Sequence, residues 1–255
     1  MIIDSHCHIN DPVYENNPEA YVKEAKENGV STMLVVGYDL TSSKRAIEIA
    51  EKFEGVYAAI GIIPAEVKNA KPDDLYEIEK LLKHKKVIAI GEIGLDYYWD
   101  KEEPLKKEQI IFFERQIDLA NKHKLPVSIH CRDAYEDCYN ILKRHPVHKR
   151  GIIHCYSGSL EMSKLFTDLG YLLGLGGTVT FKNAIKPKEV AKHVARDKYV
   201  LETDAPYLTP TPHRGELNHS KYLCFIRDEI ASLKGISPNE VEEDTNSNFN
   251  KLFNL

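Results

Sequence analysis

The sequence lacks an excess of positive charge, a disulfide framework and a long apolar segment. Its 255 residues carry 34 Lys and Arg against 39 Asp and Glu, a formal net charge of −5, so no global positive field attracts nucleic acid. The five cysteines show no disulfide-framework spacing. No apolar run is long enough to cross a bilayer, and the first residues do not follow the pattern of a signal peptide. We therefore expect a reduced, soluble, cytoplasmic protein without membrane contact.

Short runs rich in valine and isoleucine alternate with amphipathic stretches along the whole chain. The runs occupy residues 2–8, 32–37, 56–61, 87–92, 126–130, 151–155, 171–174 and 199–202. Such runs are typical of strands buried on both faces of a parallel sheet. Between them, residues 107–123 and 160–169 have helical periodicity, Gly170 ends the second of these helices, and Pro187 begins the next one.

About eight strand–helix units predict an α/β protein, a (β/α)8 TIM barrel forming a single domain over residues 1–255. An open doubly wound sheet has the same alternation. The chain lacks the Gly-rich dinucleotide fingerprint that usually follows the first strand of such a sheet. Gly174, Gly176 and Gly177 follow a late strand with another spacing, and we interpret them as tight-turn glycines.

Two histidines, His6 and His8, end the first apolar run. Residues two apart in a strand point to the same side, so both imidazoles are available to one divalent metal ion. Asp4 shares this face, either as a hydrogen-bond acceptor for a ligand imidazole or as a structural group. Cys7 points to the other side, and like Cys131 and Cys155, which also adjoin histidines, we interpret it as a small buried hydrophobe.

Other polar residues end later strands, namely Glu92, His130, His154 and Asp204. Active sites of (β/α)8 barrels lie at the carboxyl ends of the strands, so these residues and the histidine pair would face one mouth. Each one alone is more often a hydrogen-bonding or capping residue. Because buried polar groups are costly, so many at strand ends predict a shared function. Imidazoles together with a carboxylate able to bridge predict a two-metal centre.

These motifs together resemble the TatD family of metal-dependent deoxyribonucleases, within the amidohydrolase-like barrels. The resemblance runs nearly end to end and rests on residues 4–8 (DSHCH), 91–97 (GEIGLDY), 129–132 (IHCR), 154–158 (HCYSG), 202–208 (ETDAPYL) and 212–215 (PHRG). It implies a 3′-to-5′ exonuclease or related phosphodiesterase acting on DNA, as single strands or 3′ ends. It also implies two divalent ions (Zn, Mn, Mg or Fe) and a metal-activated water.

The resemblance assigns one ion to His6, His8, Glu92 and Asp204, and the other to Glu92, His130 and His154. Glu92 would bridge the two ions. Asp204 is the expected base, because its carboxylate can contact both a metal and a water. We therefore predict Asp204 and Glu92 as catalytic residues.

Further residues are candidates for substrate contact. Arg214 can grip a phosphate bidentately or form a surface ion pair, and Lys182 and Asn183 are weaker phosphate candidates. Tyr156 can stack on a base, as can Tyr207 and the aromatic run at residues 97–99, although loop aromatics more often pack locally.

The chain departs from the family pattern at Ile63 and Ala65, where members commonly carry histidines, and at His219, where they often carry an acidic residue. Two alternatives therefore stay open. One is a small-molecule amidohydrolase, lactonase or aminoacyl-ester hydrolase on the same barrel. Many of those enzymes bridge their metals with a carboxylated lysine where this chain has Glu92, which favours the phosphodiesterase. The other is a non-catalytic metal-binding barrel, against which the intact Asp204 argues.

Overall fold

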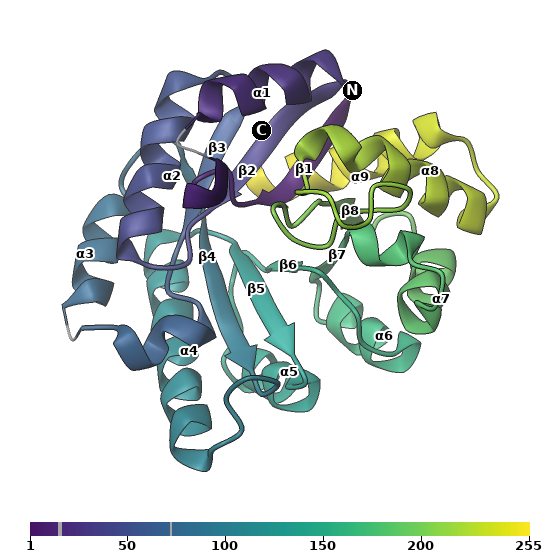
Figure 1. Ribbon diagram of the computed structural model, residues 1–255. Helices are drawn as coiled ribbons and strands as arrows, with labels where there is room; N and C mark the ends of the chain where they lie inside the picture. The colour runs from purple at the N-terminus through teal and green to yellow at the C-terminus, as the bar shows by residue number, and fades with distance from the viewer. Residues whose placement is uncertain (15–16, 72) are drawn as a thin grey trace. The chain divides into compact units, whose positions relative to one another are not determined.

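A computed structural model describes residues 1–14, 17–71 and 73–255 (Figure 1). The strands are β1 (Ile2–Cys7), β2 (Val30–Val36), β3 (Val56–Ile60), β4 (Val87–Asp96), β5 (Val127–Arg132), β6 (Gly151–Ile153), β7 (Leu172–Leu175) and β8 (Tyr199–Leu201). The α-helices are α1 (Pro18–Glu27), α2 (Leu40–Lys52), α3 (Asp74–Leu81), α4 (Glu103–His123), α5 (Tyr135–Arg144), α6 (Leu160–Asp168), α7 (Ile185–His193), α8 (Leu223–Lys234) and α9 (Pro238–Phe253). Short 3-10 helices are η1 (Pro12–Tyr14), η2 (Pro64–Asn69), η3 (Gly177–Thr180) and η4 (Ser220–Tyr222).

Every predicted apolar run contains a strand, and the strands follow one another in the sheet in the order β1 to β8. An α-helix follows each strand, and a short 3-10 helix precedes it after β1, β3, β7 and β8. Parallel strands in sequence order with intervening helices define the (β/α)8 class, so the predicted fold class is confirmed. Across the described ranges, no helix is both long enough and apolar enough to cross a membrane.

The chain divides into two compact units. The terminal unit comprises Met1–Val35 and His154–Leu255, and the central unit comprises Val36–Ile153. The prediction of a single domain over residues 1–255 stays a prediction.

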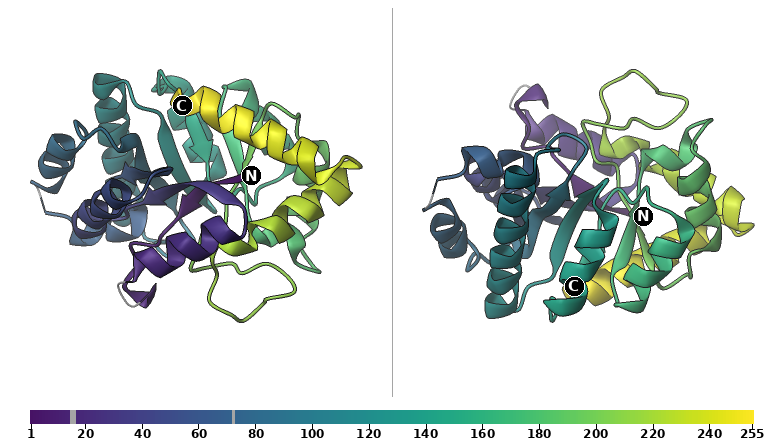
Figure 2. Two further views of the ribbon diagram at one scale, coloured as in Figure 1. Left: turned by 90° about the horizontal axis from the view of Figure 1, so that it is seen from above. Right: turned by 90° about the horizontal axis from the view of Figure 1, so that it is seen from below.

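In the terminal unit, β1 pairs with β2, and β7 pairs with β8, both in parallel. The end of β1 also meets the segment after β8, where Cys7 and Ala205 form a parallel bridge. Helix α9 packs against β1 and β8 (Figure 2). The first strand and the chain that follows the last strand therefore lie side by side.

In the central unit, β3 to β6 form parallel pairs in sequence order. Helix α4 is joined to the loop after β3 by the buried Gln116, whose amide accepts from the Ile62 N–H at 2.8 Å and donates to its carbonyl at 3.0 Å. Strand β4 extends beyond the predicted apolar run, and its last residue, Asp96, lies opposite Arg132 of β5. Four residues of the family-like motif after Glu92 are thus strand rather than loop.

Two local predictions were wrong. Gly174 lies within β7 rather than in a turn, and a side chain there would collide with the carboxylate of Glu202. Gly177 begins η3, where an added Cβ would collide with the Leu208 carbonyl. These glycines permit close approach of other chain segments. The second wrong prediction concerns Pro187, because helix α7 begins at Ile185 and Pro187 takes its third position rather than its first. The missing N–H still costs no intrahelical bond there.

Candidate metal centre

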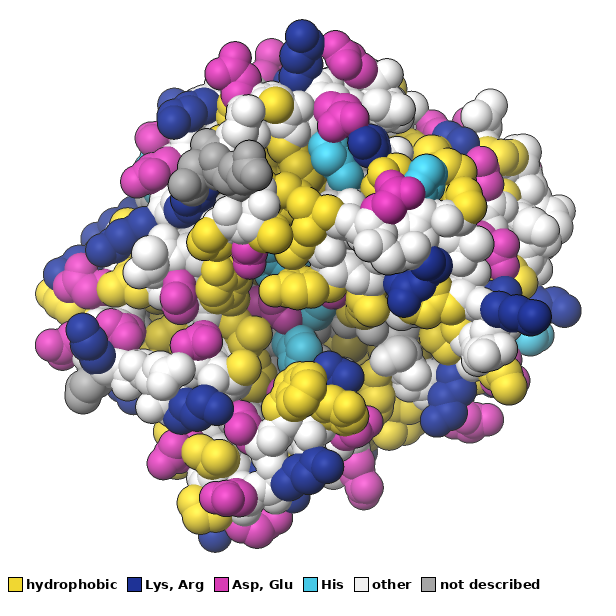
Figure 3. Space-filling model, in the orientation of Figure 1, with side chains coloured by type: hydrophobic (Ala, Val, Ile, Leu, Met, Phe, Trp, Pro, Cys, Tyr) yellow, Lys and Arg dark blue, Asp and Glu magenta, His cyan; other side chains and the backbone are white. Residues whose placement is uncertain are grey.

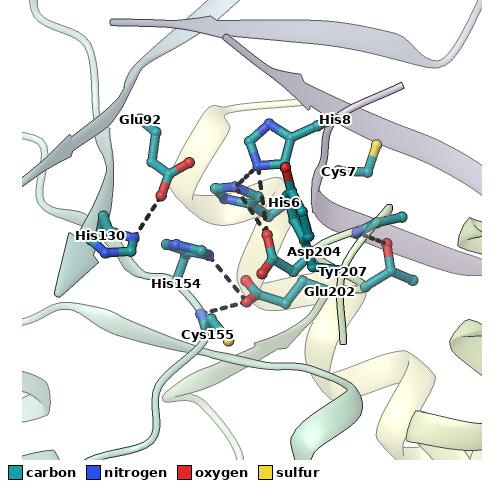
Figure 4. Close-up of polar contacts among 12 residues, drawn as sticks. His6, Cys7, His8, Glu92, His130, His154, Cys155, Glu202, Asp204 and Tyr207 are labelled. Atoms are coloured by element: carbon teal, nitrogen blue, oxygen red, sulfur yellow. Dashed lines mark hydrogen bonds and ion pairs between the residues drawn. The ribbon is translucent and has the colours of Figure 1, made fainter. Parts of the chain in front are cut away.

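The histidine pair of β1 converges as strand parity predicts. His6 and His8 are buried, and their Nε2 atoms lie 3.1 Å apart. The Asp204 Oδ1 atom lies 3.5 Å from His8 Nε2 and 3.9 Å from His6 Nε2 (Figure 4). Cys7, between the histidines, points away and lies 3.6 Å from the Leu34 carbonyl through its sulfur. Three donor atoms of the terminal unit therefore face a common point.

Asp204 is held in place by backbone contacts with β1. Its N–H donates to the His6 carbonyl at 2.9 Å, and its φ of 55° lies in the left-handed region. Burial opposes ionisation of Asp204, yet a hydrogen bond from His8 and the nearby imidazoles of His154 and His6 hold its pKa below the usual range. The carboxylate is thus kept ionised among buried imidazoles.

Asp4 was expected either to accept a hydrogen bond from a ligand imidazole or to serve as a structural group. Its side-chain partners within the described ranges are backbone N–H groups and hydroxyls, which favours the structural role. It accepts from the Thr203 N–H at 3.0 Å, the Thr203 hydroxyl at 2.6 Å and the Ser220 hydroxyl at 2.6 Å. Burial raises its pKa to about 6, against these hydrogen bonds. Asp4 is therefore a structural group that fixes the residue before Asp204.

Glu202 is a buried carboxylate that the sequence-based site prediction missed. The His6 and His154 rings stack with centroids 3.9 Å apart, and His154 Nδ1 lies 3.5 Å from Glu202 Oε1. The same oxygen accepts from the Cys155 N–H. Glu202 Oε2 is buried and has no hydrogen-bond partner within the described ranges. The sequence contained a signal for Glu202, because it lies two residues before Asp204. In an extended segment, residues two apart point to the same side.

The central unit carries a second donor group, in the carboxyl-terminal halves of β4 and β5. His130 Nδ1 lies 2.9 Å from Glu92 Oε1, and His130 Nε2 lies 2.9 Å from Asp96 Oδ2 (Figure 4 shows the first contact). Burial opposes ionisation of Asp96, but His130 and two backbone N–H groups hold its pKa below the usual range. A carboxylate on Nε2 orients the ring and leaves Nδ1 for a ligand role.

Asp96 was also missed by the sequence-based prediction, which placed the end of the strand at Glu92. The separation of β4 from β5 here depends on Gly94, which lies opposite His130. Its φ of 139° lies in the region that favours glycine, and a Cβ there would collide with the His130 carbonyl. A residue without a side chain thus brings Glu92 and His130 within contact.

The predicted substrate residues lie in different environments. Arg214 is exposed, with its guanidinium 3.9 Å from the Phe181 ring centre and 3.0 Å from the Thr209 carbonyl. Lys182 and Asn183 are exposed next to Phe181. Tyr156 is buried, and its hydroxyl donates to the Ser159 carbonyl at 2.8 Å. Its burial favours packing over the predicted substrate contact.

The positions that depart from the family pattern also have defined surroundings. Ile63 precedes η2, and Ala65 lies within it. His219 stacks on Tyr21, with ring centroids 3.7 Å apart, and its Nε2 lies 3.2 Å from a Glu24 oxygen. Burial lowers the pKa of His219 to about 4, although Glu24 opposes this shift.

The donor set of the terminal unit fits a divalent metal ion. His6, His154 and Glu202 offer ligand atoms within 4.8 Å of one another. The unsatisfied buried oxygen of Glu202 is the observation that tests the fit, because a buried carboxylate without compensation is costly. Imidazole and carboxylate ligands suit Zn²⁺, Mn²⁺ and Fe²⁺, and accommodate Mg²⁺ less readily.

The sequence matches the TatD related DNase family over residues 3–254. The chain belongs to the TatD family. Among its TatD-family relatives, YabD of Bacillus subtilis, described as an uncharacterized metal-dependent hydrolase, is 41% identical over 257 residues, with 100% of both chains covered. TatD of Mycobacterium tuberculosis, described in the same words, is 32% identical, with 100% of this chain and 98% of the relative covered.

A solved structure supports the same assignment to the TatD family. YjjV of Escherichia coli, described as a TatD homologue, is 30% identical, with a TM-score of 0.95 over 100% of this chain and 98% of the other. The resemblance drawn from the motifs is therefore confirmed.

Proposed function

We propose that this TatD-family metal-dependent hydrolase cleaves phosphodiester bonds of DNA from the 3′ end. The observation that carries the proposal is the set of buried or half-buried imidazole and carboxylate groups in or just after the strands of each unit, in a chain that matches a DNase family throughout. A phosphodiester needs stabilisation of negative charge and an activated water, and a divalent metal supplies both.

The proposed ligands are those that the resemblance implies, with two additions. His6, His8 and Asp204 would hold one ion, His130 and His154 the other, and Glu92 both. Glu202 is added as a further donor beside His154, and Asp96 as the group that orients His130. The four carboxylates of this set balance the four positive charges of two divalent ions, so attraction of phosphate would depend on nearby cationic side chains rather than on a net positive charge of the site.

The base in this proposal is Asp204. Its depressed pKa keeps it ionised at neutral pH, and its oxygen lies near His8 and His6 rather than in a neutralising ion pair with Lys or Arg. It is thus able to accept or orient the proton of an attacking water.

Because the chain has a net negative charge, phosphate binding would depend on individual cationic side chains near the site. On the face in Figure 3, Lys and Arg side chains are interspersed with Asp and Glu. The exposed Arg214, whose guanidinium lies over the Phe181 ring, is the proposed phosphate contact. Lys182 and Asn183, which directly follow Phe181 in the sequence, are weaker candidates.

The test is cleavage of single-stranded DNA labelled at its 5′ end, with Mn²⁺, Mg²⁺ or Zn²⁺ added in turn. We expect a ladder that shortens from the 3′ end and stops when chelator is added. Hydrolysis of lactones or aminoacyl esters without DNA cleavage would replace this proposal with a small-ester hydrolase. Full metal occupancy without any hydrolysis would indicate a non-catalytic barrel.

A further inference from the structure

An exposed aromatic pair follows β4 in the central unit. Tyr98 and Trp99 are 41% and 67% exposed, and their ring centroids lie 4.7 Å apart at an interplanar angle of 86°. The Arg132 guanidinium lies 3.9 Å from the Tyr98 ring centre and 5.5 Å from that of Trp99. Two exposed rings beside a cation form a surface that suits another flat, polarisable group.

The turn that carries these rings is fixed by buried hydrogen bonds. Asp96 Oδ1 accepts from the backbone N–H groups of Tyr98 at 2.9 Å and Trp99 at 3.1 Å. Buried Gln109 of α4 bonds both the N–H and the carbonyl of Asp96, and donates to Asp100 at 2.9 Å. A turn held at both ends presents its rings with little loss of conformational entropy on binding.

The same carboxylate connects the rings to the proposed metal site. Asp96 uses one oxygen for the N–H groups of Tyr98 and Trp99, and the other for His130 Nε2. The aromatic pair is thus one side chain away from a proposed metal ligand, at the carboxyl end of the strand that carries Glu92.

We propose that Trp99, supported by Tyr98 and Arg132, stacks on a base of single-stranded nucleic acid bound at the metal site. This inference rests on the proposed phosphodiesterase function. Every base has a π-face, so stacking holds a strand without selecting a sequence, as a processive or general nuclease requires. It also supplies affinity where the chain offers no global positive charge.

Trp99 is the only tryptophan in the chain, so its fluorescence reports on this one ring. The first test titrates the metal-loaded protein with a short phosphorothioate oligothymidylate, which resists cleavage, and with an abasic oligomer of the same length. We expect quenching by the base-containing strand alone. Equal quenching by both strands, or none by either, would overturn the proposal.

The second test measures the Kd of a labelled oligothymidylate for two variants. Trp99→Leu should raise the Kd roughly 5- to 100-fold, and Trp99→Phe should restore part of the affinity. Tyr76→Leu is the matched control, because Tyr76 is 60% exposed in the same unit and carries Lys80 at 4.1 Å from its ring centre. An unchanged Kd for Trp99→Leu would refute the stacking role.

The two proposals fail separately. Base-dependent quenching without DNA cleavage would refute the nuclease and leave the stacking site standing. DNA cleavage without quenching, with a normal Kd for Trp99→Leu, would refute the stacking site alone.

Discussion

The two units surround their histidines in different ways. In the terminal unit, His6 is fully buried, stacks on His154 and faces Asp204 at 3.9 Å. In the central unit, the His130 side chain is 20% exposed, and carboxylates lie 2.9 Å from both of its ring nitrogens. The first imidazole is enclosed by packing and faces other imidazoles, whereas the second is held between two carboxylates.

This difference predicts where each half is vulnerable. Donors held by packing depend on the integrity of the surrounding fold, because a buried ring moves only if its neighbours move. A donor held by carboxylates depends on their charge, because that charge sets the tautomer and the basicity of the ring. Substitutions can therefore damage the terminal unit through stability and the central unit through metal affinity.

The largest expected effect is on turnover, from a substitution in the terminal unit. Asp204→Asn keeps the shape of the side chain but removes the proton acceptor, so we expect a roughly 10²- to 10⁴-fold loss of cleavage rate. Metal content should be largely retained. The measurement is single-turnover cleavage of labelled single-stranded DNA, with metal analysis of the same sample.

Asp197→Asn is the matched control, because Asp197 contacts only the exposed Lys198 at 3.1 Å among the ion pairs of the described ranges. It should cleave at the normal rate. An unchanged rate for Asp204→Asn would remove Asp204 from the mechanism.

A second substitution tests the dependence of the terminal unit on its fold. Asp4→Ala leaves the Thr203 N–H and the hydroxyls of Thr203 and Ser220 without their acceptor, so the free energy of unfolding should fall by about 3 kcal/mol. Asp39→Ala, which removes the N-cap of α2 in the central unit, should cost about 1 kcal/mol. Urea unfolding compares the two. Equal losses would contradict the special position of Asp4.

A third pair of substitutions tests the proposed assignment of His130 and His154 to one ion. In Asp96→Asn, an amide NH₂ facing His130 Nε2 favours the tautomer with its proton on Nδ1, which removes the lone pair that faces Glu92. Glu202→Gln removes a charge beside His154. Both should weaken binding of that ion about 10- to 100-fold and spare the ion proposed for His6, His8 and Asp204.

Calorimetric titration with Mn²⁺ resolves the two sites of each variant. Asp137→Asn, at an exposed acceptor of the Tyr97 hydroxyl, is the control and should bind as the native protein does. If the two variants weakened different sites, the proposed assignment of His130 and His154 to one ion would be wrong.

The smallest expected effect at neutral pH comes from His219 in the terminal unit, whose contribution to stability changes only as the pH falls. Its pKa is about 4 in the folded protein against 6.5 when unperturbed, so below pH 6.5 the unfolded chain binds a proton that the folded chain excludes. This contribution to stability is complete above pH 6.5 and is lost as the pH falls towards 4, with a slope of up to about 1.4 kcal/mol per pH unit.

His219→Phe keeps a ring to stack on Tyr21 and removes the titrating group. The unfolding free energies of the two proteins should run parallel above pH 6.5 and converge or cross at lower pH. Curves that stay parallel down to pH 4 would show that burial does not lower the pKa of His219.

Much of the fold was predictable because it is repetitive. Strands buried on both faces are continuous apolar runs, and every predicted run contains a strand. Parity within one strand predicted that His6 and His8 face the same way while Cys7 turns aside. These inferences use only the period of a single element.

The missed residues depend on contacts between elements. Asp96 lies beside His130 because β4 continues to pair with β5 past Glu92. The sequence does not reveal this continuation, because Glu92 and the glycines interrupt the apolar run. Glu202 fits because Gly174 of the neighbouring strand leaves room for it. Space between neighbouring strands leaves no periodic pattern in the sequence, so the sequence alone predicts a turn at Gly174.

Gly94 has a consequence for how this protein can be altered. Its position opposite His130 allows no Cβ without pushing β5 away, and β5 carries the imidazole that faces Glu92. The distance between the proposed ligands Glu92 and His130 therefore depends on the absence of a side chain at residue 94. Libraries that vary the ligands themselves would sample metal preference only if residue 94 stays glycine.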